Sequence, residues 1–175
     1  MTAIRDGNRD DVPTGRRSGL PLPERVYIPQ QNTRHPDGAF DPVRAQADPI
    51  TRSETASRNI AWHHGLDLLE SGFYWEAHEV LEAVWLNAPP NTPERTLVQG
   101  VIQLANAALK HRMKRRKAAL RLCDIADALI AEAKPDHSLK LRGHVMDLSL
   151  ETLSEAIDRV RASVRTDVAM KIRLS

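Results

Sequence analysis

After residue 50, apolar residues recur every three or four positions, and short breaks rich in Pro, Gly or Asn interrupt the pattern. This spacing puts apolar side chains on one face of an α-helix and does not fit the alternation of a β-strand. The breaks delimit five expected helices, at about 52–70, 73–86, 92–111 and 118–133 and from Ser149 onward. Because the connections are short, neighbouring helices should run antiparallel. We therefore predict an all-α protein built as a single helical bundle of about five helices.

The first 49 residues differ from the rest of the chain. Prolines recur there at positions 13, 21, 23, 29, 36, 42 and 49, and helical periodicity is weak. We expect three parts: an extended, proline-rich and partly disordered N-terminal arm (1–49), a helical bundle domain (50–165) and a C-terminal tail (166–175). Residues 20–41 contain enough apolar side chains to lie along a folded surface.

Composition excludes several classes of function. The chain has 25 Lys and Arg against 23 Asp and Glu, a balance that argues against nucleic-acid binding by the protein as a whole. We expect no membrane span, because no stretch approaches about 18 continuous apolar residues. The first twenty residues lack the apolar core of a secretory signal, so a cytoplasmic protein is expected. The single Cys123 lies at helical apolar spacing and predicts a buried, reduced thiol.

The expected helix at 73–86 carries the residues best suited to chemistry. His78 and Glu82 are four positions apart and share one side of the helix with aromatic rings. An imidazole and a carboxylate are suitable ligands for zinc, manganese or iron, although the same pair could form a structural hydrogen bond. Glu79 is rotated by about 100° from His78 and is the weaker ligand candidate. The aromatic candidates for lining this site are Tyr74, Trp75 and Trp85.

Further ligands would have to come from other segments. His64 lies on the first expected helix, three positions before Asp67, and His35 lies in a turn of the arm. On the third expected helix, Gln99 and Gln103 belong to a narrow polar stripe. This stripe either faces solvent or turns inward to hydrogen-bond His78 and Glu82.

The segment 110–117 contains six Lys or Arg residues, among them Lys114, Arg115 and Arg116. Such a run could contact phosphates, but it is more often a solvated connection between helices. Since no aromatic residues accompany it as a stacking platform, nucleic-acid binding is the lesser alternative.

Residues 72–85 and 99–105 resemble the domain of unknown function 309 family, whose motif is matched here by Ala77, His78, Glu79, Glu82 and Trp85. The resemblance covers about 60–133. It implies a small helical bundle, and such proteins are sometimes labelled predicted metal-dependent hydrolases. It also implies that Gln99, Gly100 and Gln103 face the motif. One departure concerns the turn between the third and fourth helices, where many relatives have glycine and this chain has 114–116.

Two main hypotheses follow, and they leave open whether the protein is an enzyme. In the first, one divalent metal held by His78 and Glu82, with help from His35 or His64, activates water for hydrolysis. Glu79 and Glu82 are then the candidate catalytic carboxylates. In the second, the protein is a non-enzymatic interaction module in which His78 and Glu82 form a buried polar network, and its surface serves an unknown partner or a second copy in a homo-oligomer.

Overall fold

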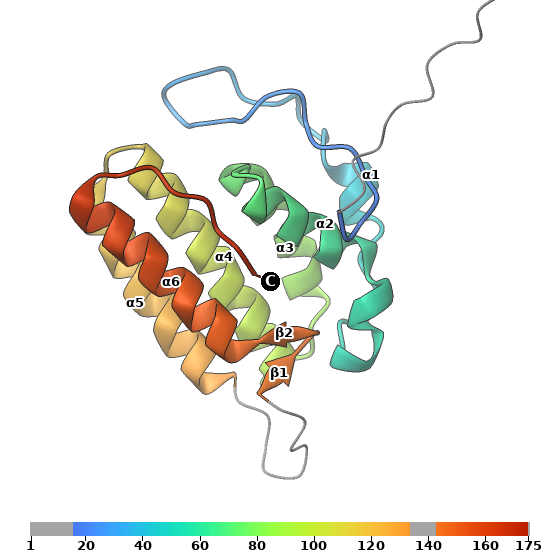
Figure 1. Cartoon of the computed structure of the whole chain (residues 1–175). Coiled ribbons are helices and arrows are strands. Elements are labelled where there is room, and N and C mark those ends of the chain that lie inside the picture. Colours follow the sequence, from blue (N-terminus) through green and yellow to red (C-terminus); the bar gives the residue numbers. More distant parts are fainter. Residues whose placement is uncertain (1–15, 134–142, 175) are drawn as a thin grey trace, which may run out of the picture.

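Five helices form the body of the protein in the computed structural model, which describes residues 16–133 and 143–174 (Figure 1). They are α2 (Ile60–Glu70), α3 (Tyr74–Leu86), α4 (Pro93–Arg112), α5 (Arg116–Glu132) and α6 (Leu150–Thr166). Two short helical elements, α1 (Asp41–Arg44) and the 3-10 helix η1 (Ser53–Arg58), precede them. The predicted all-α bundle is therefore confirmed. Pro135, which follows the predicted end of the fourth helix at about 133, lies outside the described residues.

The first predicted helix, 52–70, is wrong in its extent, because it consists of η1 followed by α2. Asn59 separates them with an extended backbone, and its side-chain oxygen accepts a hydrogen bond from the Trp62 amide at 3.1 Å. This is a standard N-cap, and it starts a new helix at Ile60. The Thr51 side chain, just before η1, does not cap a helix, because its hydroxyl donates to the Val84 carbonyl at 2.8 Å.

A two-stranded hairpin that periodicity did not predict precedes α6. Strands β1 (His144–Val145) and β2 (Leu148–Ser149) pair antiparallel around Met146 and Asp147, which both have positive φ. This is the backbone twist that two-residue hairpin turns need. The Trp62 indole donates to the Met146 carbonyl at 3.2 Å and so attaches the hairpin to α2.

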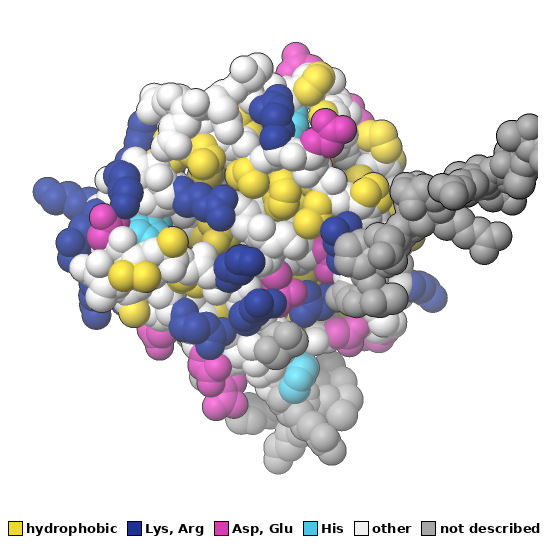
Figure 2. Space-filling model, turned by 45° about the horizontal axis from the view of Figure 1, so that its top comes forward, with side chains coloured by type: hydrophobic (Ala, Val, Ile, Leu, Met, Phe, Trp, Pro, Cys, Tyr) yellow, Lys and Arg dark blue, Asp and Glu magenta, His cyan; other side chains and the backbone are white. Residues whose placement is uncertain are grey.

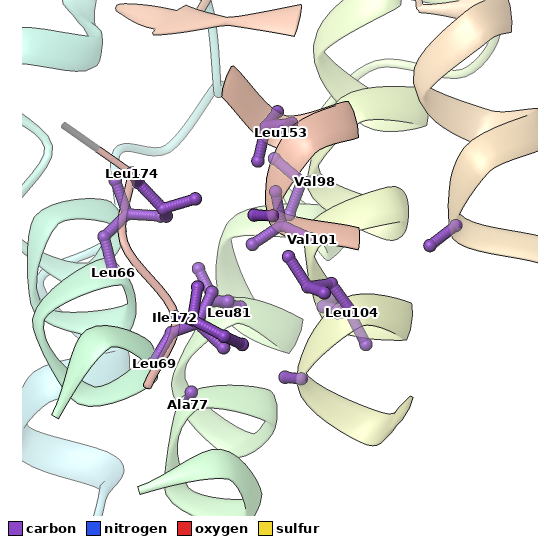
Figure 3. Close-up of a cluster of buried hydrophobic side chains, with 14 of the residues drawn as sticks. Leu66, Leu69, Ala77, Leu81, Val98, Val101, Leu104, Leu153, Ile172 and Leu174 are labelled. Atoms are coloured by element: carbon purple, nitrogen blue, oxygen red, sulfur yellow. The ribbon is translucent and has the colours of Figure 1, made fainter. Parts of the chain in front are cut away.

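The core lies between α2, α3, α4, α5 and α6, and the C-terminal segment completes it; Figure 3 shows part of this core. After α6 the chain turns back across the bundle (Figure 1), which buries Ile172 completely and Leu174 almost completely. The Leu174 amide donates to a Glu70 carboxylate oxygen at 2.7 Å. Cys123 is also fully buried, as predicted, and burial raises the pKa of its thiol to about 11. Among the described helices, none is both long and apolar enough to cross a membrane.

Candidate functional site

The arm runs over α2 and α3 (Figure 1), and a buried carboxylate lies where they meet. The Glu76 side chain, on α3, is 0% exposed. Its Oε1 accepts a hydrogen bond from the Tyr27 amide at 2.6 Å and lies 2.8 Å from His35 Nε2. Its Oε2 is buried and has no hydrogen-bond partner among residues 16–133 and 143–174. Sequence reasoning missed Glu76, although its position four residues before the apolar Val80 and three after Phe73 was a usable signal.

Aromatic rings fix the orientation of His35. Its imidazole stacks on Trp75, with ring centroids 6.0 Å apart and planes 20° apart. Phe40 meets it edge-on at 5.2 Å, and Tyr27 packs edge-on against Trp75 at 4.9 Å. Trp75, predicted to line the site at His78 and Glu82, packs against His35 of the arm. The arm supplies most of this cage, since His35, Phe40 and Tyr27 all come from it.

His64, on α2, forms a second polar cluster with the arm. Its Nδ1 lies 3.2 Å from the Ser18 hydroxyl, and that hydroxyl donates to Asp67 Oδ2 at 2.6 Å. The Asp67 carboxylate also accepts the amides of Arg17 and Ser18, at 3.0 and 2.9 Å. Burial lowers the pKa of His64, an effect that Asp67 opposes and Arg16 reinforces. Ser18 thus connects His64 and Asp67, which the sequence placed on one helical turn.

His35 and His64 line the same pocket, which has a volume of about 430 Å³. The rest of its lining is mostly apolar and comes from the arm and α1: Pro21, Leu22, Pro23, Glu24, Arg25, Pro36, Ala39, Phe40 and Val43. Of the predicted ligands, the structure therefore brings together two histidines that are 29 positions apart in the sequence.

The residues of the predicted metal site at His78 contact other side chains rather than one another. His78 Nδ1 lies 2.9 Å from the side-chain oxygen of Asn106, on α4. Glu79 and Glu82 instead face Arg44 of α1, at 3.9 and 3.6 Å. Among the described residues, no group of three or more His, Cys, Asp or Glu side chains is placed to hold a metal ion. The metal site therefore stays a prediction, and these residues do not supply a complete ligand set.

The other residues expected to line the motif have separate environments. Gln99 and Gln103 are half-buried on α4, where Asn106 is the residue that reaches His78. Gly100 faces Leu129 and Ile130 of α5 rather than the motif. Trp85 lies under the Arg95 guanidinium at 4.1 Å, and Tyr74 under that of Arg112 at 4.5 Å.

The basic run forms the end of α4, the turn and the start of α5. Lys114 pairs with Asp167 at 2.6 Å, and Arg115 donates to the Gln30 side chain at 2.7 Å. Lys114 has φ +57°, the left-handed conformation that glycine adopts most easily, at the turn named above as a departure from the family resemblance. On the face in Figure 2, Lys and Arg side chains are spread among apolar and acidic ones. Nucleic-acid binding by Lys114, Arg115 and Arg116 stays an untested prediction.

Comparison with known proteins supports the family resemblance. Residues 62–122 match the family model described as Domain of unknown function (DUF309). No curated protein matches the chain, and no solved structure does. The matched segment contains His64, Glu76 and His78, whereas His35 lies in the arm before it. The helical core at 62–122 is therefore similar to the DUF309 family, whose function is unknown, and the resemblance inferred from the sequence is supported over these residues.

Proposed function

We propose that the surface formed by α2 and α3 is a docking face for an extended polypeptide segment, and that the arm is the segment that occupies it here. The observation that carries this proposal is that every acidic side chain of α2 and α3 contacts the arm or α1. Arg17 and Ser18 contact Glu70 and Asp67, respectively. Tyr27 and His35 contact Glu76, while Arg44 faces Glu79 and Glu82. This develops the interaction-module hypothesis, with the acidic residues as the binding groups.

The contacts of these five carboxylates are unequal in energy. The Arg44 pairs are partly exposed and 3.6–3.9 Å long, so each should contribute below about 1 kcal/mol. Glu76 is fully buried, and truncation that leaves the partners of a buried hydrogen-bonded group unsatisfied typically costs about 1–3 kcal/mol. Glu76 is therefore the expected anchor of the arm.

Glu76→Ala and Glu82→Ala form a matched pair, since both truncate a glutamate of α3 that faces the arm, one buried and one exposed. We expect Glu76→Ala to speed amide hydrogen exchange across 16–44 while α5 and α6 keep their protection. Glu82→Ala should change arm exchange little. Hydrogen exchange read by mass spectrometry checks both variants. If the arm is as well protected from exchange in Glu76→Ala as in the wild type, the docking proposal is contradicted.

The metal-dependent hydrolase is the second candidate. One contact favours it: the Asn106 oxygen orients the His78 ring through Nδ1 and leaves Nε2 for a ligand, as neighbours of metal-binding histidines do. Elemental analysis of protein purified without chelator, beside His78→Ala and Glu82→Gln, tests it. Near-stoichiometric metal that is lost in both variants would support a metal site. Wild type that holds no metal and takes up no zinc, manganese or iron would contradict it.

A further inference from the structure

The pocket that His35 and His64 share is suited to a ligand of its own. We propose that it binds a small, neutral, mainly apolar molecule with hydroxyl or N–H groups, and that His35 and His64 accept hydrogen bonds from those groups. This site goes beyond the docking role. It rests on that role in one respect, because the docked arm supplies most of the pocket wall.

His35 presents one ring nitrogen as an acceptor. Its Nε2 lies 2.8 Å from Glu76 Oε1, so Nε2–H donates a hydrogen bond to the Glu76 carboxylate, and the lone pair of the neutral ring is on Nδ1. Because the ring packs against Trp75 and Phe40, the orientation of Nδ1 is fixed. His35 is therefore a preorganised acceptor.

The same reasoning applies to His64 through different partners. Ser18 uses its single hydroxyl proton for Asp67, so its oxygen can only accept from His64 Nδ1. The neutral ring then carries its proton on Nδ1 and its lone pair on Nε2. Burial, which lowers the pKa of His64, favours this neutral form. The pocket thus has two imidazoles whose free nitrogens both accept.

The lining of the pocket indicates what chemistry the rest of the ligand should have. Leu22, Phe40, Val43 and three prolines give it an apolar lining, and its volume of about 430 Å³ lies in the range of small-molecule pockets. The two charged residues in the lining, Glu24 and Arg25, are exposed, and Arg25 already donates to the carbonyls of Thr33 and Arg34. A neutral ligand with an apolar body and a donor group therefore fits better than an ion.

Phenol and anisole test the proposal, because they share an apolar ring and only phenol has a donor. The full chain, labelled with ¹⁵N in its histidines, is titrated with each compound by NMR. We expect the free protein to show a proton on Nε2 of His35 and on Nδ1 of His64. Phenol has one donor, so it should shift the other nitrogen of one of the two rings and bind about ten-fold more tightly than anisole, the effect of one hydrogen bond. His63 and His78, which lie outside the pocket lining, should not respond.

Val43→Trp provides a variant that leaves both histidines in place. Filling the pocket from α1 should abolish the phenol response while the two tautomers persist. Equal binding of phenol and anisole, or no response at His35 and His64, would overturn the ligand site and leave the docking role intact. A free protein without the two tautomers would mean that the arm is not docked, and would overturn both proposals. A response that survives in Val43→Trp would place phenol elsewhere and also overturn the site.

Discussion

At the scale of single residues, the contacts that polar side chains of α2 and α3 make do not follow from their spacing along the helix. His78 and Glu82 are neighbours on one helix, yet His78 pairs with Asn106 of α4 and Glu82 with Arg44 of α1. Glu76 also pairs with a residue that is distant in the sequence, since its partner His35 is 41 positions away. Helical spacing predicts which side chains share a face, but the residues packed against that face determine which contacts those side chains make.

His64 should make stability depend on pH. Burial lowers its pKa in the folded state below the ordinary 6.5, so the unfolded chain binds the proton more readily. The contribution of His64 is therefore complete above pH 6.5, decreases as the pH falls below that value, and is lost once the pH passes through the lowered pKa. Urea unfolding at about pH 8 and about pH 5 measures this loss.

His64→Gln should remove that part of the pH dependence, and His63→Gln, its neighbour on α2, serves as the control. Asp67, Ser18 and Arg16 are the charged or polar groups that surround His64, and both variants retain them. An equal acid-induced loss of stability in wild type and His64→Gln would show that other groups cause it.

At the scale of elements, two glycines allow close helix packing, and adding a side chain at each should reduce stability by different amounts. A Cβ at Gly65 of α2 would lie 2.4 and 2.6 Å from Cδ2 and Cγ of the fully buried Leu81 on α3. A Cβ at Gly100 of α4 would meet mainly the tip of Ile130, with Cδ1 at 2.7 Å. The branch point of Leu81 cannot move away as easily as the end of the Ile130 side chain.

We therefore expect Gly65→Ala to lower the free energy of unfolding by about 1–3 kcal/mol, as overpacking does. Gly100→Ala should cost less, because the gain in helix propensity, roughly 0.5–1 kcal/mol, offsets its smaller clash. Urea denaturation of both variants gives the comparison. A larger loss for Gly100→Ala would mean that α4 and α5 adjust less readily than α2 and α3.

At the scale of the whole molecule, the last residues belong to the core. Ile172 is 0% exposed, and in Figure 3 it lies beside Leu69 and Leu81 of the helices that carry the candidate site. Ile172→Ala should therefore lower the free energy of unfolding by about 2–5 kcal/mol, the usual range for a truncated core residue. Val168→Ala, at a position 60% exposed, is the matched control and should have little effect. Similar losses in both variants, measured by thermal unfolding, would contradict the core position of Ile172.

The sequence determined the helical class, the approximate extent of four of the five main helices and the buried state of Cys123, because these depend on local periodicity and on start and stop signals. It also singled out His35, His64 and Trp75, since few other residues could supply ligands or lining. It did not predict the hairpin at 144–149, whose two-residue strands are too short to show a period.

The tertiary structure alone decided which of these residues meet. His35 reaches Glu76, and Ser18 reaches His64, only because the arm follows one path over α2 and α3. That path depends on many weak contacts between segments 40 or more positions apart, and no local spacing encodes them. Buried carboxylates need a partner, and only the folded chain determines which partner lies within reach.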